Sequence, residues 1–575
     1  MRSLLHYIWF YRRYMLGGVL ALLVVNVGQI TIRRVIGPVV DQVIASQGEN
    51  LLEYAGLIVG LGLIAAIARF FWRYLLLGAS RRIRRDVRDR LYDHVLTLSA
   101  PFFQNTKIGD LMAHFTNDVN AVMRATGFGV LTLFDFLIIA TIAIGWMISI
   151  SPTLTLYTVA PLPLMTVFVI LFGRTIHRRF RVVQETFSRL TERVQETLSG
   201  IRVVKTFTQE RGMNRLFADT NQLFVDTNMH LVNIWAFFEP LMGVVAGIAR
   251  LLVFLLGARS VLAGAISVGD FTSFYLLWEM LTWPMRAIGL TVNIVQRGAA
   301  SMNRIDTILD VEPEIEDLPN AVRLDGPGHI QYENLSYRYE PDGPWVLQEI
   351  DLDVEPGQTL GVIGLTGSGK STLVHLLVRV FEPPDGKLLI DGRDVREYQL
   401  ADLRRKISLV PQDGFLFSTT IWDNVAFGNP DATDKQIIEA TRRAGIYDEI
   451  MDMPQGFETI LGERGVSLSG GQRQRVAIAR ALVSDPQVLV LDDALSAVDA
   501  EKEEEILDNL RDVLATRTSV VIAHRISAVQ DLDHIVVLDR GRIQERGTHA
   551  ELLANDGVYA HLHELQSAEA EIEIN

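Results

Sequence analysis

Residues 364–371 read GLTGSGKS, and this stretch decides the fold of the C-terminal half of the chain. It fits the pattern G-x-x-x-x-G-K-[ST], in which glycine backbone N–H groups surround phosphate oxygens. An apolar run at 359–363 predicts a strand before it, and residues 372–380 predict a helix whose N-terminus favours anions. We expect Lys370 to reach the β and γ phosphates of a nucleotide and Ser371 to bind Mg²⁺. The nucleotide ligands expected from this segment are Gly364, Gly367, Ser368, Gly369, Lys370, Ser371 and Thr372.

Two more stretches indicate a nucleotide-binding domain. Residues 488–492 read VLVLD, which predicts a strand ending in Asp492, and a carboxylate there suits Mg²⁺. Residues 468–472 read LSGGQ and precede a helix predicted at 473–482, which makes a second glycine-rich anion cradle. Its expected ligands are Ser469, Gly470, Gly471 and Gln472. Because one nucleotide needs only one phosphate loop, the second cradle predicts a dimer in which it contacts the partner's nucleotide.

Charge divides the 575 residues into two parts. Residues 1–310 carry a net charge of +10 and residues 311–575 carry −24, which gives −14 for the whole chain. The mean hydropathy is +0.21, which is high for a soluble protein. The acidic part lacks the clustered Lys and Arg that nucleic-acid phosphates require, so we expect no nucleic acid as a partner. The chain has no cysteine, which excludes disulfides and Cys-ligated metals.

The first part contains apolar segments with the length and composition of membrane-spanning helices. We expect six spans, at 15–32, at 54–77, in the two halves of 136–173 around Ser151-Pro152, at 230–262 and at 267–297. The arginine-rich segment RRIRRDVRDR at 81–90 and the arginines at 174–181 favour the cytoplasmic side. This orientation predicts a multi-pass protein of the cytoplasmic (inner) membrane with its N-terminus and its acidic domain in the cytoplasm. A signal peptide is the competing interpretation, but no small-residue cleavage site stands out before Arg33.

The fold class expected is a multidomain chain. Residues 1–310 form an all-α domain of six transmembrane helices, and its two long inner connections extend as helices beyond the bilayer. Residues 311–328 are rich in Pro, Gly and acidic residues and read as a linker. Residues 329–575 alternate strands with helices, which predicts an α/β domain with a largely parallel sheet.

Ionisable residues inside the apolar segments are candidates for a transport pathway or for buried ion pairs, because a charge at membrane depth faces protein or water. They are Glu239, Glu279 and Arg286, and Trp278 and Trp283 are candidates to line the same pathway.

Taken together, these motifs resemble an exporter-type ABC half-transporter over essentially the whole chain. The stretches at 102–122 and 199–210 resemble the two intracellular connections of that family, and Gly462-Glu-Arg-Gly465 resembles the segment before its signature. In the family, ATP is sandwiched between the phosphate loop of one chain and the LSGGQ of the other. The resemblance implies that Tyr339 stacks on adenine, Gln412 contacts Mg²⁺, Asp499 signals across the dimer and His524 contacts the γ-phosphate. It implies ATP and Mg²⁺ as cofactors.

One residue departs from the family pattern. The family usually has glutamate after the strand-ending aspartate, as the base or positioner of the attacking water, and this chain has Asp493. Aspartate is one methylene shorter, which withdraws the carboxylate by roughly 1.5 Å, and a displacement near 1 Å can cost about 100-fold in rate. We therefore expect the site on this phosphate loop to bind ATP and hydrolyse it poorly. The catalytic residues expected are Asp493, His524 and Gln412, and the Mg²⁺ ligands are Ser371, Gln412 and Asp492.

The predicted function is ATP-driven export of an amphipathic or hydrophobic substrate by alternating access. The expected partners are a second, different half-transporter that carries the glutamate, membrane lipid, and a drug-like, lipid or peptide substrate. Three alternatives stay open: a lipid flippase, a homodimer with two slow sites, and a regulatory ATP-gated subunit.

Overall fold

The computed structural model describes residues 2–45, 50–160, 162–462, 465, 468–498 and 500–574. The chain divides into two compact units. The first unit comprises residues 1–96 and 107–311, and the second comprises residues 97–106 and 312–575. Ten residues of the predicted first domain, 97–106, thus pack with the second unit.

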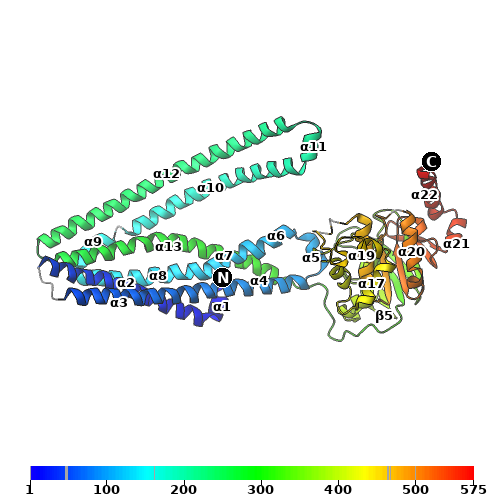
Figure 1. Ribbon diagram of the computed structural model, residues 1–575, viewed down its shortest axis with the longest axis horizontal. Coiled ribbons are helices and arrows are strands. Elements are labelled where there is room, and N and C mark those ends of the chain that lie inside the picture. The colour runs from blue at the N-terminus through cyan, green and yellow to red at the C-terminus, as the bar shows by residue number, and fades with distance from the viewer. Residues whose placement is uncertain are drawn as a thin grey trace. The chain divides into compact units, whose positions relative to one another are not determined.

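The first unit is built of helices (Figure 1). Its long helices α10 and α12 pack side by side, with α11 between them in the sequence (Figure 1). Three π-helical turns, η1 to η3, interrupt the helices near the arginine-rich segment and near residues 114–129. The helical elements are α1 (Arg2–Phe10), α2 (Arg12–Ile44), α3 (Leu51–Trp72), η1 (Arg73–Leu77), α4 (Gly78–Thr97), α6 (Ile108–Ala113), η2 (His114–Asp118), α7 (Val119–Arg124), η3 (Ala125–Gly129), α8 (Val130–Ile150), α9 (Pro152–Val159), α10 (Leu162–Ser199), α11 (Ile201–Thr206), α12 (Glu210–Leu262) and α13 (Val268–Leu309).

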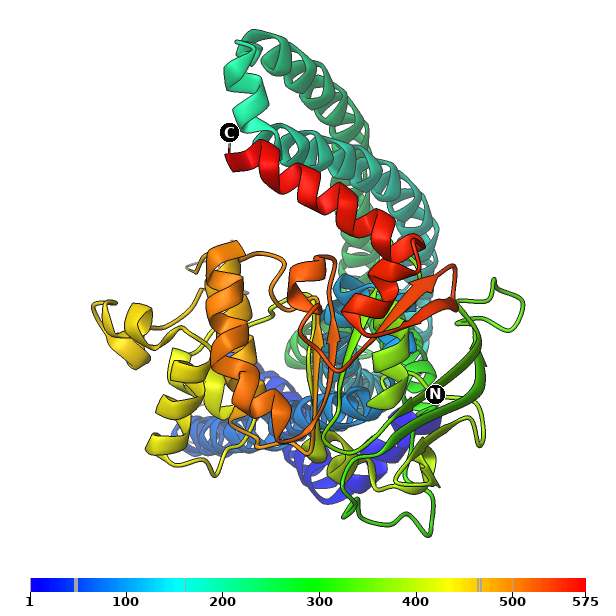
Figure 2. The same ribbon diagram turned by 90° about the vertical axis from the view of Figure 1, so that its right-hand side faces the viewer.

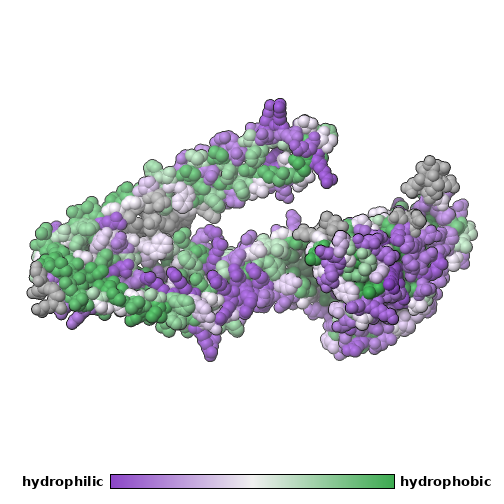
Figure 3. All heavy atoms as spheres, viewed as in Figure 1, coloured by the Kyte–Doolittle hydropathy of each residue, from purple (hydrophilic) through white to green (hydrophobic). Residues whose placement is uncertain are grey.

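Four helical segments among the described residues are long and apolar enough to cross a membrane: Arg12–Ile44, Leu51–Thr97, Ile108–Ile150 and Glu210–Leu262. The other two expected spans are also helical, in α9 with α10 and in α13. Apolar side chains gather on the surface of the first unit over α2, α3 and the C-terminal half of α12, and polar ones gather over α4 (Figure 3). An apolar surface of this extent needs lipid around it, because water would not wet it favourably.

The short turn predicted at Ser151-Pro152 is confirmed. Helix α8 ends at Ile150, and α9 begins at Pro152, where a missing N–H costs nothing. The Ser151 hydroxyl oxygen accepts a hydrogen bond from the backbone N–H of Leu154 at 3.3 Å and so caps α9.

Glycines let α2 and α13 approach closely. A methyl group on Gly269 would lie 2.1 Å from the carbonyl oxygen of Gly37, so a larger residue would push the helices apart. Asp41 accepts hydrogen bonds from the Ser267 hydroxyl at 2.6 Å and from the Gly269 N–H at 2.7 Å, which ties the end of α2 to the start of α13.

The suggestion that Trp278 lines a pathway is wrong for this side chain. Trp278 is 1% exposed, belongs to the apolar core of the first unit and donates its indole N–H to the carbonyl oxygen of Thr158 at 3.0 Å. Trp283 is 64% exposed and lines a cavity with Glu279. The side chains of Glu239 and Arg286 lie outside the described residues.

The second unit is an α/β structure with two sheets. The larger sheet has the order β10-β9-β3-β8-β7-β6 and is parallel except for β10, as expected for a nucleotide-binding fold. The smaller sheet, β2-β1-β4-β5, is antiparallel. In Figure 2 the green strands of residues 330–354 lie on one side of this unit and the yellow and orange helices of residues 434–515 lie on the other.

The strands are β1 (Ile330–Tyr337), β2 (Leu347–Val354), β3 (Thr359–Ile363), β4 (Leu388–Ile390), β5 (Arg393–Asp394), β6 (Ile407–Val410), β7 (Val488–Asp492), β8 (Thr518–Ile522), β9 (His534–Asp539) and β10 (Arg542–Gly547). The α-helices are α5 (Ala100–Asn105), α14 (Lys370–Leu377), α15 (Leu400–Lys406), α16 (Ile421–Ala426), α17 (Asp434–Arg443), α18 (Tyr447–Met451), α19 (Gly470–Leu482), α20 (Ala500–Ala515), α21 (His549–Ala554) and α22 (Val558–Ile574). Both strands predicted beside the site, at 359–363 and 488–492, are confirmed residue for residue. The two predicted helices begin two and three residues earlier than expected, at Lys370 and Gly470.

The segment predicted as a linker, 311–328, packs against the second unit despite its polar composition. Leu324 is fully buried in the core beneath the smaller sheet, and its N–H donates to Asp402 at 2.7 Å. Ile315 is buried as well, and its N–H donates to the Ser99 hydroxyl at 3.2 Å.

Candidate nucleotide site

The phosphate loop lies between the buried strand β3 and helix α14, at the carboxyl end of a central strand of the parallel sheet. Ligands bind at this edge in open α/β sheets. Gly367 and Gly369 have φ angles of 82° and 104°, which favour glycine. A methyl group on Gly369 would also lie 2.9 Å from the carbonyl oxygen of Val346. The sequence pattern thus supplies glycine where the loop turns back on itself.

The loop has polar groups that a phosphate would satisfy. The Ser368 hydroxyl is buried and has no hydrogen-bond partner among the described residues. Lys370 is 6% exposed, and its ammonium donates to the carbonyl oxygens of Gly364 at 2.8 Å and Leu365 at 3.1 Å. Burial lowers the pKa of Lys370, against the opposing effect of Asp493 and Asp492. An orphaned hydroxyl, a buried cation and a glycine cradle fit the phosphates of ATP.

Oxygen donors suited to Mg²⁺ meet beside the loop. The Ser371 hydroxyl donates to the Asp492 carboxylate at 3.0 Å, and Asp492 is 2% exposed at the end of β7. Burial raises the pKa of Asp492, so a cation beside it would favour its charged form. His375, one helical turn after Ser371, approaches Asp492 to 3.9 Å. Sequence reasoning missed His375, although its spacing of four from Ser371 places both on one face of α14.

Gln412 and Asp493 are joined directly. The Gln412 side-chain amide donates to the Asp493 carboxylate at 3.0 Å. The Asp493 backbone has a φ of 49°, a left-handed conformation that aspartate tolerates better than most residues, and its N–H donates to the carbonyl oxygen of Ile522 at 2.9 Å. Asp493 is 7% exposed. Its carboxylate is therefore held toward Gln412 on a constrained backbone.

These groups surround one cavity of about 300 Å³. Tyr339 stands at its edge, 46% exposed, with its hydroxyl 2.8 Å from that of Thr372 and its ring edge-to-face with Phe381. The exposed His524 also lines the cavity. Its lining residues are Tyr339, Val346, Thr366, Gly367, Ser368, Gly369, Lys370, Ser371, Thr372, Gln412, Asp492, Asp493, Ile522 and His524. Three of these residues were not predicted: Val346 and Ile522 are apolar positions that no motif marks, and Thr366 occupies a variable position of the phosphate-loop pattern.

Gly364 lies behind the loop and is not among the lining residues. The LSGGQ residues do not line this cavity either, within the described part of the chain. Ser469 instead caps α19 through a capping box, in which its hydroxyl accepts from the Gln472 N–H at 3.2 Å and the Gln472 amide oxygen accepts from the Ser469 N–H at 2.9 Å. Asp499, Glu463 and Arg464 lie outside the described residues, so their predicted roles are not placed.

Buried Gln474 links the signature helix, α19, which begins within LSGGQ, to the segment that follows strand β7. Sequence reasoning missed this residue. Its amide N–H₂ donates to the Ser496 hydroxyl at 3.1 Å and to the carbonyl oxygen of Asp493 at 3.4 Å, and its amide oxygen accepts from the Ala497 N–H at 3.0 Å. The only sequence signal is a polar residue on the buried face of α19. Gln474 therefore fixes the segment that follows Asp493 against the helix that carries LSGGQ.

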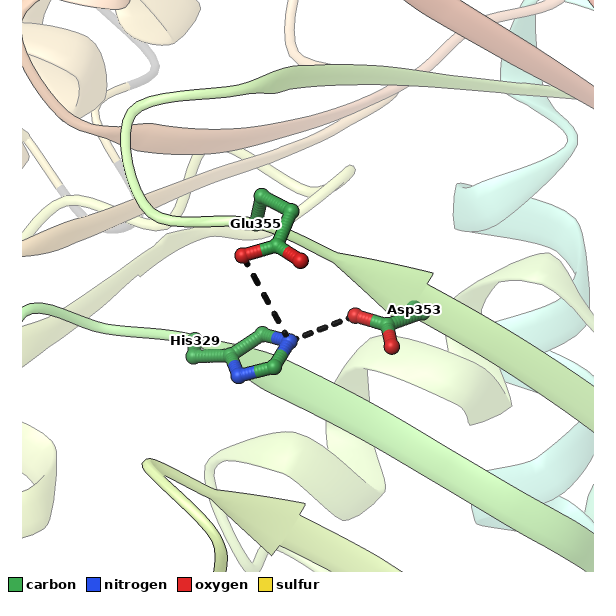
Figure 4. Close-up of side chains that lie close together, drawn as sticks. All are labelled: His329, Asp353 and Glu355. Atoms are coloured by element: carbon green, nitrogen blue, oxygen red, sulfur yellow. Dashed lines mark hydrogen bonds and ion pairs between the residues drawn. The ribbon is translucent and has the colours of Figure 1, made fainter.

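A separate polar cluster lies on the smaller sheet. His329 Nε2 lies 2.5 Å from an Asp353 oxygen and 4.0 Å from a Glu355 oxygen (Figure 4). The carboxylate side chains are 59% and 63% exposed. The strand pairing explains the contact, because Gln331 lies opposite Asp353 and Ile330 opposite Val354. An exposed cross-strand pair accounts for this cluster without a ligand.

The comparisons with known proteins agree with this geometry. Residues 15–285 match the family model "ABC transporter transmembrane region", and residues 347–496 match "ABC transporter". The chain is 39% identical to the probable multidrug resistance ABC transporter ATP-binding/permease protein YheI of Bacillus subtilis (strain 168), over 97% of this chain and 96% of that protein. It is 35% identical to the ATP-dependent lipid A-core flippase of Syntrophus aciditrophicus (strain SB), over 93% of this chain and 89% of that protein.

A solved structure agrees as well: a bacterial Atm1-family ABC exporter with ATP bound. The TM-score is 0.80 at 26% identity, covering 96% of this chain and 99% of that one. The chain therefore belongs to the family of exporter-type ABC transporters, with a helical transmembrane domain fused to an ATP-binding α/β domain.

Proposed function

We propose that the chain is one half of an ATP-driven exporter of amphipathic or hydrophobic molecules across the cytoplasmic membrane. The observation that carries this proposal is a phosphate-binding cavity on the same chain as a helical unit with an extensive apolar surface. Relatives named as a probable multidrug resistance transporter and a lipid A-core flippase support a drug-like or lipid substrate. Lipid flipping is the second candidate, favoured by the flippase relative.

The chain's own residues have distinct tasks in this proposal. The glycine backbone of the loop and Lys370 bind the phosphates, and Tyr339 stacks on the base. Ser371 and Asp492, with Gln412, would hold Mg²⁺, which neutralises phosphate charge when bound. His524 contacts the terminal phosphate from across the cavity. Nucleotide binding drives alternating access only through its preference for the closed state of the dimer.

We further propose that this site hydrolyses ATP weakly and that the chain pairs with a different half-transporter. Asp493 is shorter than the family's usual glutamate, and its carboxylate already accepts a hydrogen bond from Gln412. The LSGGQ segment has its residues in place at the N-terminus of α19. This asymmetry supports an arrangement in which the chain lends its signature to the partner's hydrolytic site.

The test is the ATPase rate of the full-length complex, purified with the partner chain that accompanies it, for wild type and Asp493→Glu. The longer carboxylate should raise hydrolysis about 10- to 100-fold at this site. Asp556→Glu is the matched control, because Asp556 also has a left-handed backbone, with φ of 51°. A homodimer with brisk hydrolysis that Asp493→Glu leaves unchanged would overturn the weak-site proposal. If Asp493→Glu leaves the ATPase rate unchanged and the wild-type complex does not couple hydrolysis to transport of a substrate, the regulatory alternative is favoured instead.

A further inference from the structure

A cavity of about 640 Å³ lies on the first unit, where α3 passes through the π-helical turn η1 into α4. Arginines line it: Arg69, Arg73, Arg81 and Arg82. The other lining residues are Tyr14, Ala66, Phe70, Tyr74, Leu77 and Gly78, so the part of the wall that the structure describes has no carboxylate. The cavity therefore combines positive charge with apolar and aromatic groups.

The arginines are not neutralised by the protein. Arg69, Arg73 and Arg81 are exposed and make no ion pair with the described residues. Arg82 lies over the Tyr14 ring at 4.4 Å, and Arg73 lies over the Trp72 ring at 5.5 Å, which are aromatic and not acidic contacts. By contrast Arg85, outside the cavity, binds Asp86 at 2.8 Å. Unpaired cations beside apolar surface are costly at membrane depth, so they need an anion.

The surroundings indicate what kind of anion. Phe70, Phe71 and Tyr74 are 65%, 49% and 61% exposed on the outer face of α3 and η1. Exposed aromatic rings beside arginines are typical of the level at which lipid headgroups lie. The arginine-rich segment 81–90 continues from the cavity, and basic pockets between helices on the cytoplasmic side bind phosphate headgroups.

A second cavity of the first unit shares two arginines with this one. Arg69 and Arg73 also line a cavity of about 380 Å³ with Asn26, Asp135, Glu279 and Trp283. In it the Asn26 amide donates to the Asp135 carboxylate at 2.8 Å. The second cavity holds its own carboxylates, whereas the first has none among its described lining residues. The anion preference therefore belongs to the first cavity.

We propose that the first cavity, of about 640 Å³, binds the phosphate headgroup of an anionic phospholipid of the cytoplasmic leaflet. Arg73 of η1 and Arg81 of α4 hold the phosphate, and Phe70 and Tyr74 contact the start of the acyl chains. A π-helical turn at η1, a feature frequent at functional sites, contributes Arg73, Tyr74 and Leu77 to the wall. This binding site does not depend on the transported substrate or on the identity of the partner.

The experiment uses the full-length complex in detergent and native mass spectrometry, with phosphatidylglycerol or phosphatidylcholine of identical acyl chains. Wild type should retain phosphatidylglycerol preferentially. The double variant Arg73→Gln with Arg81→Gln should bind it about 30-fold more weakly, with phosphatidylcholine unaffected. Arg88→Gln with Arg90→Gln removes the same charge from exposed positions of α4 outside the cavity and should leave the preference unchanged.

Two results would overturn the proposal. One is equal loss of phosphatidylglycerol in the control double variant, which would make the effect one of net charge. The other is a wild-type preference for phosphatidylglycerol over phosphatidylcholine that does not weaken between about 0.05 and 0.5 M salt. Exposed charges become screened over roughly this range. The salt measurement needs no variant, so it tests the headgroup proposal even if the substitutions impair folding. ATP-driven transport measured alongside tests the export function separately.

Discussion

The phosphate loop and the LSGGQ segment are two anion cradles at helix N-termini, and they differ in how completely one chain builds them. Residues 366–371 of the loop line a cavity with its cation, the residues proposed to hold magnesium and a carboxylate already in hydrogen-bond contact. The segment at Ser469–Gln472 has its backbone fixed by a capping box but, among the described residues, lines no part of that cavity. We therefore expect the first cradle to bind ATP with this chain's residues alone, and the second to act only when a second chain brings a nucleotide to it.

The largest expected effect tests the loop. Lys370→Ala removes a buried cation from the phosphates and should weaken ATP binding at this site by about 3 kcal/mol, or roughly 100-fold. Titration with a fluorescent ATP analogue measures this loss. Lys435→Ala, an exposed lysine on α17, is the control and should bind as wild type does. Equal affinities in the two variants would mean that the loop is not the site of nucleotide binding.

The next effect separates the two cradles. Ser469→Ala removes the cap of α19, so hydrolysis by the assembled complex should fall about 10-fold while nucleotide affinity at the loop stays unchanged. Thr433→Ala removes the equivalent capping box of α17 and should cost a similar stability, typically about 1 kcal/mol, without changing hydrolysis. If both variants slow hydrolysis alike, the effect comes from stability, and the comparison between the cradles fails.

The smallest effect concerns how the signature helix is held. Glu449 on α18 accepts hydrogen bonds from Gln472 at 2.9 Å and Arg475 at 2.5 Å. Burial raises the pKa of Glu449, but the hydrogen bonds from Arg475 and Gln472 outweigh it and hold the pKa below its usual value. A carboxylate whose pKa is lower in the folded state than in the unfolded chain stabilises the folded state at pH values above its unfolded pKa. This contribution is lost as the pH falls through the pKa of the folded state.

Glu449→Gln should therefore lower the free energy of unfolding by about 1 kcal/mol near pH 7, a figure kept small because the side chain is partly exposed. The difference from wild type should shrink below roughly pH 4.5, the ordinary value for glutamate. Thermal unfolding of the full-length protein, followed by tryptophan fluorescence, measures both. Glu439→Gln breaks an exposed pair with Arg443 and should change stability by less than about 0.5 kcal/mol at either pH. A pH-independent difference for Glu449→Gln would rule out the charged pair as its cause.

The membrane half shows where prediction from sequence was weaker. The turn at Ser151-Pro152 was predictable because proline and a capping hydroxyl act within a few residues. The burial of Trp278 was not, since its partner, the carbonyl of Thr158, lies 120 residues away. The packing of 311–328 was hidden for the same reason: Leu324 is one of a few scattered apolar residues in a stretch rich in charges, Pro and Gly, and only the fold brings a core to it.

The sequence by itself determined the glycine-rich loop, the position of Asp492 at the end of its strand and the two strands beside them, because backbone conformation and hydrophobic periodicity are encoded locally. It also determined that residue 493 is an aspartate. Only the tertiary structure decided that Gln412 holds that aspartate, that Gln474 ties it to the signature helix, and that unpaired arginines share one cavity. These contacts join residues far apart in the chain, and their geometry depends on packing that no local pattern encodes.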